Sequence, residues 1–179
     1  MNSYFLEDND IALRPLTIGD LTQEYLDWLN DKDVNNYSFR RFSSLSEAQL
    51  RSFLESLPLR SDEMHFAIIF KPEKKHIGNI GMKAIHWQAR FAELGILIGC
   101  RVFWGRGIAV QAIRLIQDYA FNRLNLNRLE MGSFNPAAIR AYEKAGWLRE
   151  GIQRERIFID GKYHDEVRMA ILASEFFRQ

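Results

Sequence analysis

Two glycines precede an amphipathic helix in the middle of this 179-residue chain. Gly105 and Gly107 follow an apolar run, and from Ile108 the apolar residues return at helical spacing. Free N–H groups at a helix N-terminus carry a partial positive charge, and glycines let the backbone approach a ligand closely. The pattern is typical of a phosphate or pyrophosphate site. It is also common as simple turn geometry, so alone it leaves both interpretations open.

Glu93 places a carboxylate at the start of an otherwise apolar run, Leu94 to Ile98. A charge there is costly unless it reaches the surface or is paired. Glu93 is therefore a candidate functional residue. The alternative is a strand-end glutamate that is exposed on the other face or paired with an arginine.

A later helix brings a phenol and an amide into one motif, Asn135-x-x-Ala138-x-x-x-Tyr142-Glu-Lys-x-Gly146-Trp. Asn135 is a good N-cap with Pro136 at the first helical position, and Gly146 is a helix-terminating glycine. The phenol of Tyr142 is neutral at pH 7 and can donate a proton. Its spacing on the helix equally predicts a core aromatic.

Strands must position these residues, and the apolar periodicity predicts seven of them. A hairpin joins residues 64–70 to 76–82, and Asp160-Gly161 is predicted as the turn of a final strand pair. The strand before Gly105, the helix after it and the next strand form a crossover, which requires two parallel strands. The strands are predicted at residues 11–16, 64–70, 76–82, 89–98, around 129–131, 147–159 and 164–172.

Four helices complete the expected fold. Asp20 is predicted as the N-cap of the first, which ends at Asn30-Asp31, and Ser44-Leu-Ser-Glu47 is predicted as the capping box of the second. The other two begin after Gly107 and at Asn135. We therefore expect one α+β domain over residues 1–179, a mixed, mostly antiparallel sheet of six to seven strands flanked by about four helices.

The motif of Asn135 to Trp147, together with Trp104-Gly-Arg-Gly-Ile-Ala109, resembles the acetyl-CoA-dependent N-acetyltransferases of the GNAT superfamily, closest in style to the RimJ/RimL-like branch. The resemblance also covers Ile11-Ala-Leu-Arg-Pro-Leu16, Trp28-Leu-Asn-Asp31 and Ile159-Asp-Gly-Lys-Tyr-His-Asp165. It implies a GNAT-type sheet that splits near acetyl-CoA. The family pattern usually opens with Gln or Arg; RimJ/RimL-like members often carry Trp, as this chain does at Trp104.

The resemblance implies a role for each motif. Glu93 would be the general base for the amine, directly or through water, and Tyr142 would protonate the CoA thiolate. A backbone N–H near Leu97 or Ile98 would stabilise the oxyanion. Arg106 either contacts phosphate or is a solvated side chain. The implied acetyl-CoA contacts are the backbone of Ile96, Leu97 and Ile98, the loop of Trp104, Gly105, Arg106, Gly107, Ile108 and Ala109, and Asn135.

The implied acceptor side is the first helix and the loop after it, with Trp28, Tyr37, Phe39 and Arg40 as candidates. Trp28 also fits the core. The acceptor is a small-molecule or peptide amine: a protein N-terminus, an amino sugar on a nucleotide carrier, or a polyamine or other small amine. Because this loop offers Arg40 and Arg41 and not clustered carboxylates, it favours an acceptor with anionic groups.

Two other interpretations compete with direct acetyl transfer in a ternary complex: a protein that binds acyl-CoA without catalysis, and transfer through an acyl-enzyme. A non-catalytic acyl-CoA-binding sensor or scaffold would share the fold, but carrying both Tyr142 and Glu93 argues against it. An acyl-enzyme on Cys100 is disfavoured because no histidine lies beside it in sequence.

Composition sets limits on partners. A net charge of +1 gives no basic field for nucleic acid. The four histidines lack metal-ligand spacing, so no metal is expected, and no apolar run approaches the roughly 18 residues of a membrane span. A single cysteine and a start without signal-peptide features indicate a cytoplasmic protein. It is expected to be a monomer or homodimer.

Overall fold

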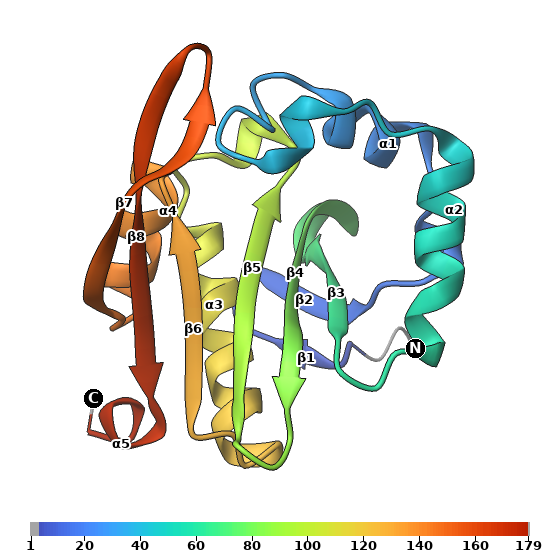
Figure 1. The fold of residues 1–179 in the computed structure, drawn as a ribbon. Coiled ribbons are helices and arrows are strands. Elements are labelled where there is room, and N and C mark those ends of the chain that lie inside the picture. The colour runs from blue at the N-terminus through green and yellow to red at the C-terminus, as the bar shows by residue number, and fades with distance from the viewer. Residues whose placement is uncertain (1–3, 179) are drawn as a thin grey trace.

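A computed structural model describes residues 4–178 as one sheet with helices on both faces (Figure 1). Its strand order is β1-β2-β3-β4-β5-β6-β8-β7. The strands are β1 Leu6–Glu7, β2 Ile11–Pro15, β3 Met64–Phe70, β4 Lys75–His86, β5 Phe91–Ile98, β6 Arg128–Ser133, β7 Leu148–Ile159 and β8 Lys162–Leu172. The helices are α1 Gln23–Asn30, α2 Glu47–Ser56, α3 Ile108–Asp118, α4 Pro136–Lys144 and α5 Ala173–Phe176.

The α+β class is confirmed, with one more strand and one more helix than expected. The additional strand, β1, has two residues, and the additional helix, α5, has four. Neither is long enough to show a period in the sequence. Both predicted hairpins are present, β3 with β4 and β7 with β8.

β5 and β6 form the parallel pair that the crossover requires, and α3 connects them. Their register runs only from Phe91↔Arg128 to Glu93↔Glu130. Both strands continue beyond that point, β5 to Ile98 and β6 to Ser133, without pairing to each other. The sheet therefore splits directly after Glu93, as the resemblance implied.

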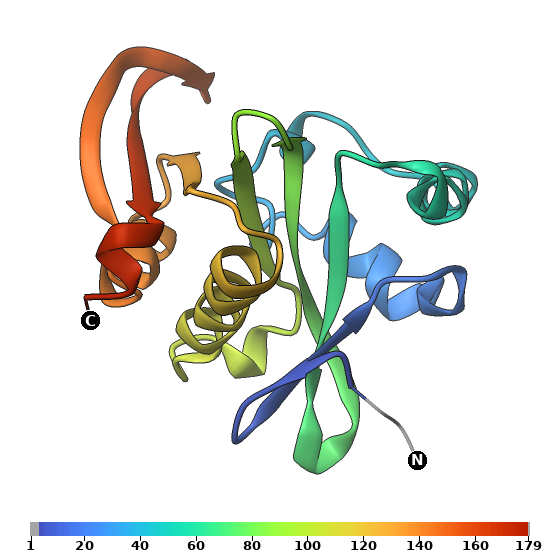
Figure 2. The ribbon, with the colours of Figure 1, turned by 90° about the horizontal axis from the view of Figure 1, so that it is seen from below.

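The two faces of the sheet differ in what covers them. α3 and α4 lie against one face, where Ala92 and Leu94 of β5 are buried (Figure 2). Side chains alternate along a strand, so Glu93 and Gly95 point to the opposite side, which we call the open face. α1 and α2 lie over part of this open face, toward β3 and β4 (Figures 1 and 2).

Two predicted helix caps are wrong. Thr22, not Asp20, caps α1, and its side chain accepts a hydrogen bond from the Tyr25 N–H. At α2 the capping box lies two residues later than predicted and consists of Ser46 and Gln49. In the first case a partner six residues earlier in the chain binds the carboxylate that the sequence analysis assigned to the cap.

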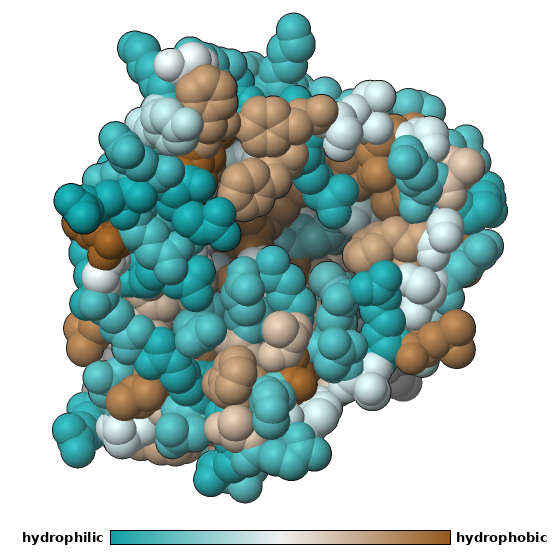
Figure 3. Space-filling view, viewed as in Figure 1, coloured by the Kyte–Doolittle hydropathy of each residue, from teal (hydrophilic) through white to brown (hydrophobic). Residues whose placement is uncertain are grey.

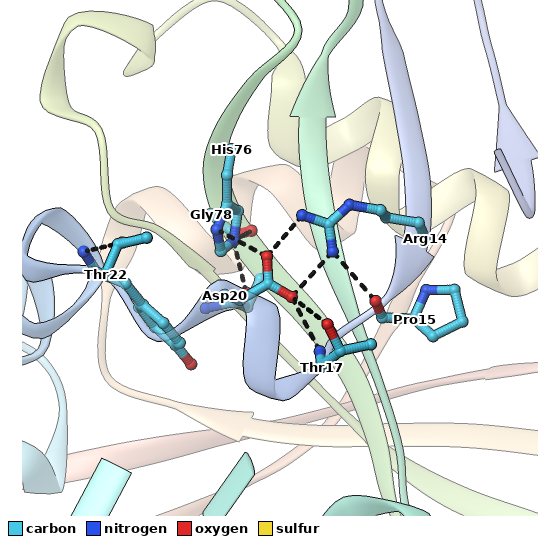
Figure 4. A network of polar contacts seen from close by, with 9 residues as sticks. Arg14, Pro15, Thr17, Asp20, Thr22, His76 and Gly78 are labelled. Atoms are coloured by element: carbon cyan, nitrogen blue, oxygen red, sulfur yellow. Dashed lines mark hydrogen bonds and ion pairs between the residues drawn. The ribbon is translucent and has the colours of Figure 1, made fainter. Parts of the chain in front are cut away.

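That partner is Arg14 of β2 (Figure 4). The Arg14 guanidinium donates to both carboxylate oxygens of Asp20, at 2.8 and 2.5 Å, and the Thr17 N–H donates at 2.8 Å. Burial alone would raise the pKa of Asp20, but these hydrogen bonds and the Arg14 charge outweigh it, and the pKa is lowered. His76 Nδ1 lies 3.7 Å from the same carboxylate, and burial lowers the pKa of this imidazole.

We predict that Asp20→Asn lowers the free energy of unfolding by about 1.5–3 kcal/mol, the typical loss for a hydrogen bond to a charged group. A carboxyl whose folded pKa is lowered stabilises the fold above its unfolded pKa, about 3.9, and this contribution disappears as pH falls through the folded pKa. The difference from wild type in urea unfolding should therefore shrink below pH 4. Asp27→Asn, on the exposed side of α1, is the control; an equal loss in both variants would contradict the role of Asp20.

Candidate active site

Tyr142 lies at the point where the sheet splits. It belongs to the buried stripe of α4, is 2% exposed, and packs edge-on against Trp147 with ring centroids 4.7 Å apart. Its hydroxyl donates to the Leu94 carbonyl of β5 at 3.2 Å. Leu94 is the first β5 residue beyond the last β5–β6 pair, so the phenol reaches the strand where pairing with β6 has stopped.

The electrostatics keep this phenol protonated. Burial raises the pKa of Tyr142, and the negative charge of Glu93 raises it further. The second effect also means that the two predicted catalytic side chains lie near each other. Glu93 itself forms an ion pair with Lys83 Nζ at 3.1 Å and is partly exposed. The partner that the sequence left open is thus a lysine of the neighbouring strand, and the carboxylate remains accessible from the open face.

The free edge of β5 offers backbone groups to the split. Hydrogen-bonding direction alternates along a strand. The Leu94 carbonyl binds Tyr142 on the β6 side, and the Ile98 carbonyl accepts from Trp104 Nε1 at 2.8 Å, so the backbone of Ile96 faces that side as well. By the same alternation, the backbone N–H and C=O of Leu97 point the other way, toward its partner Asn79 in β4. Of the three predicted pantetheine contacts, the structure therefore turns Ile96 and Ile98 toward the split, but not Leu97.

The glycine loop opens α3 as the sequence predicted. Gly105 and Gly107 have φ values of 74° and 79°, in the left-handed region, and Gly107 is the N-cap of α3. A Cβ at either position would meet no atom within 4 Å, so open space lies beside both. The first amides of the helix, including those of Ile108 and Ala109, have no partner within a helix. Arg106 lies over the Phe103 ring, 5.3 Å from its centroid.

Asn135 connects β6 to the helix that carries Tyr142. Its side-chain oxygen accepts from the Ala137 N–H at 2.9 Å, and its own N–H donates to the Ser133 hydroxyl at 3.0 Å. The predicted cap is confirmed.

The acceptor-side candidates are not all together. Trp28 is 7% exposed, and its ring packs so closely on Gly99 that a Cβ there would lie 2.2 Å from it. Tyr37 is exposed and stands edge-on to Phe134, which directly follows β6. Trp28 therefore lies in the core, whereas Tyr37 lies beside the end of β6.

Phe39 and Arg40 lie in a short 3₁₀ helix, Phe39–Phe42, and are exposed. The adjacent Arg41 does not point to a ligand site: it donates to the Asn36 carbonyl at 2.9 Å and to Asp160 at 2.7 Å, at the tip of the β7–β8 hairpin. Arg40 also lines a cavity of about 800 Å³ at the end of α1, which Tyr142 and Glu93 do not line. That cavity is separate from the split.

The sequence analysis missed the surface in front of the split. Figure 3 shows a hollow on the open face, over β4 and β5 and below the segment that joins α1 to α2. Gly81, Gly95 and Gly132 lie on this face, and Glu166 of β8 is buried next to Gly132. A glycine inside a strand marks a bulge or the close approach of another group, and that signal was present in the sequence.

These features define a class of protein. A sheet that splits after its one parallel pair, a phenol at the split and an amide-rich helix start on the crossover fit an enzyme that binds an acyl-CoA and transfers its acyl group. Residues 10–147 match the family described as acetyltransferase (GNAT) domain, and the chain belongs to this family. It is an N-acetyltransferase that takes the acetyl group from acetyl-CoA and transfers it to an amine.

Relatives of known sequence and structure agree. The chain is 31% identical to the spermidine N(1)-acetyltransferase of Vibrio cholerae, over 96% of this chain and 98% of that protein, and 29% identical to the probable N-acetyltransferase YjcK of Bacillus subtilis, over 93% and 96%. The crystal structure of spermidine N-acetyltransferase from Vibrio cholerae with CoA and spermine is similar with a TM-score of 0.86 at 30% identity, covering 95% of this chain and 99% of that one.

We predict that Gly107→Ala weakens acetyl-CoA binding about fivefold, which corresponds to about 1 kcal/mol. A Cβ is strained at φ 79°, and its methyl group would occupy the open space beside the first amides of α3. Isothermal titration with acetyl-CoA measures the effect. Gly151→Ala is the control, because its Cβ also meets nothing within 4 Å but lies on β7. Unchanged affinity in Gly107→Ala would contradict a pyrophosphate role for the loop.

Proposed function

We propose that acetyl transfer is direct, with acetyl-CoA in the split and the amine on the open face in one ternary complex. The observation that carries this proposal is the Tyr142 hydroxyl on the Leu94 carbonyl, a proton donor at the place where β5 loses its partner strand. Holding both reactants together makes the reaction effectively unimolecular.

In this mechanism each residue has one task. Glu93 takes the proton of the attacking amine, directly or through water, because an alkylamine is mostly protonated at pH 7. The N–H groups of Ile96 and Ile98 stand on the split side of β5, where they pair with pantetheine and stabilise the oxyanion. Tyr142 donates its proton to the CoA thiolate as it leaves.

The remaining predicted cofactor contacts complete the proposal. The loop from Gly105 to Ala109 binds the pyrophosphate through its amides. Trp104 closes the end of the β5 edge by its hydrogen bond to Ile98, and Asn135 lies at the base of α4. An acyl-enzyme on Cys100 is not part of the proposal, because this thiol is buried in the core.

For the acceptor we favour a small aliphatic amine with more than one amino group. The support is the activity for which the Vibrio cholerae relative is named, spermidine N(1)-acetylation, and the fact that Arg41 is already bound to Asp160. An acceptor with anionic groups is the second candidate. It is favoured by Arg40, whose guanidinium has no hydrogen bond or ion pair to the part of the chain that the structure describes, and by exposed Tyr37 and Phe39.

We also propose the branch of the family, the cellular location and the number of domains. The RimJ/RimL-like branch is supported by Trp104, a cytoplasmic location by the single buried cysteine, and one domain by the continuous eight-stranded sheet. Within residues 4–178 no helix is long and apolar enough to span a membrane.

We predict that wild type releases CoA from acetyl-CoA with at least one amine in a panel of N-terminal peptides, amino sugars, sugar nucleotides and polyamines.

We predict that Tyr142→Phe lowers kcat for that amine by roughly 10²–10⁴-fold, the usual range for a general acid. Acetyl-CoA affinity should stay within about twofold, because the ring and its packing are retained. Since the pKa of Tyr142 is raised, wild type should not lose activity through this group below pH 10. A kcat within threefold of wild type would contradict the assignment.

We predict that Glu93→Gln lowers kcat/KM at neutral pH and changes the acidic limb of its pH profile, because amide nitrogen and oxygen cannot accept the amine proton. Steady-state rates between pH 6 and 10 measure this. Glu55→Gln, an exposed carboxylate on α2, should leave the profile as in wild type. If the Glu93→Gln profile also matched wild type, Glu93 would not be the base.

A further inference from the structure

Three glycines lie in one row across the open face. The β4–β5 register pairs Gly81 with Gly95. The β5–β6 register pairs Glu93 with Glu130, so two residues further along each strand Gly95 and Gly132 stand on opposite sides of the split. Paired residues of a sheet point to the same face, so the row runs from β4 across the split to β6.

The outer two glycines are covered by polar side chains, and the middle one is not. A Cβ on Gly81 would lie 2.8 Å from His65 Nδ1, and a Cβ on Gly132 would lie 2.8 Å from Glu166 Oε2 and 2.5 Å from Arg168 Nη1. A Cβ on Gly95 would meet nothing within 4 Å. We call this space the Gly95 slot: it lies over Gly95, between His65 on one side and Glu166 with Arg168 on the other.

The slot lies beside the proposed chemistry. Gly95 directly follows Leu94, whose carbonyl binds Tyr142, and its side of the strand is that of Glu93. The hollow of Figure 3 opens on the same face over β4 and β5. An acceptor in the slot thus approaches the split from the side opposite α3 and α4.

Glu166 is buried with a long ion pair to Arg168 and no hydrogen bond to its carboxylate from residues 4–178. It is 8% exposed, accepts no hydrogen bond from residues 4–178, and its nearest cation is Arg168 Nη1 at 3.6 Å. Asp20, similarly buried at 3%, accepts hydrogen bonds from Arg14 and Thr17. A buried charge is costly unless it is paired and hydrogen-bonded, so the difference needs an explanation.

The surrounding charges leave this site negative. Arg168 is shared with Glu130, at 3.8 Å, and Arg128 binds both Glu130 and Glu150. Two guanidinium groups thus face three carboxylates, Glu130, Glu150 and Glu166, for a formal charge of −1. A cation is the ligand that completes such a cluster.

We propose that the Gly95 slot receives the acceptor with its reacting amine over Gly95, and that Glu166 binds a second ammonium group of the same molecule. The absence of a side chain at Gly95 suits an unbranched alkyl chain between the two amines. This makes Glu166 a specificity-determining residue for diamines and polyamines over monoamines. The proposal rests on the acetyltransferase mechanism above.

Filling the slot is the first test, with Gly95→Leu as the variant. Its Cβ meets open space and its φ is not left-handed, so the fold should be retained, as the melting temperature will show. We expect kcat/KM for 1,4-diaminobutane to fall at least roughly tenfold while acetyl-CoA affinity is unchanged, because pantetheine pairs with the backbone of Ile96 and Ile98. Gly151→Leu, equally open but on β7, should behave as wild type. Unchanged kcat/KM in Gly95→Leu would overturn the slot.

Removing the charge is the second test. Glu166→Gln should raise KM for 1,4-diaminobutane roughly tenfold or more, the loss expected for a hydrogen bond to a charged group, and change KM for butylamine less than twofold. Glu55→Gln, an exposed carboxylate on α2 outside this cluster, is the control and should leave both KM values as in wild type. An equal effect on both amines, or none on the diamine, would overturn the role of Glu166. If Glu166→Gln does not fold, wild type decides: equal kcat/KM for 1,4-diaminobutane and butylamine would overturn the role of Glu166.

A binding experiment separates this proposal from the mechanism. Titration of 1,4-diaminobutane into the protein saturated with CoA should show binding that Gly95→Leu and Glu166→Gln weaken, even if turnover is absent. Wild type that binds the diamine but acetylates no amine would refute the mechanism alone. Wild type that acetylates monoamines and diamines with equal kcat/KM would refute the role of Glu166 alone.

Discussion

The candidate active site depends on one hydrogen-bond acceptor, the Leu94 carbonyl oxygen. One residue earlier, β5 is still in register with β6 through Glu93 and Glu130. At Leu94 a phenol from α4 takes the place of a strand partner. Because Tyr142 satisfies this carbonyl, the sheet can open without leaving a buried acceptor unpaired, which would cost free energy. The same contact thus permits the split and places a proton donor in it.

The elements on either side of the split hold it open. On the β5 side the strand remains paired with β4 up to Ile98, so its free edge is rigid. On the β6 side Asn135 caps α4 and binds Ser133, which fixes the helix to the end of the strand. Beneath α1, the Arg14–Asp20 pair anchors the covering segment to β2. The gap is therefore built between fixed borders, and ligands can bind with little loss of conformational entropy.

Local patterns in the sequence were sufficient for the parts of the site that lie within one stretch of chain. Gly105, Gly107, Asn135 and Tyr142 belong to short motifs that indicate their helix boundaries, and the structure places all four in the elements predicted. Asp20 shows where this fails. Its sequence context is that of an N-cap, but Arg14 of β2, six residues earlier, and the Thr17 N–H bind the carboxylate, and the cap passes to Thr22. The carboxylate thus binds residues that precede it in the chain instead of the helix that follows it.

The face that Glu166 and Gly95 share was beyond sequence reasoning for a different reason. Gly95 stands out as a glycine within a strand, but what it faces depends on strand register. Gly95 lies opposite Gly132 because of the β5–β6 pairing, and Glu166 lies over Gly132 because β8 pairs with β6. Register fixes which residues of separate strands share a face, and no period within one strand encodes it. The β5–β6 pairing therefore has a second consequence besides ending at the split. Its last pair, Glu93 with Glu130, sets Gly95 opposite Gly132, and these glycines leave space on the open face beside the split.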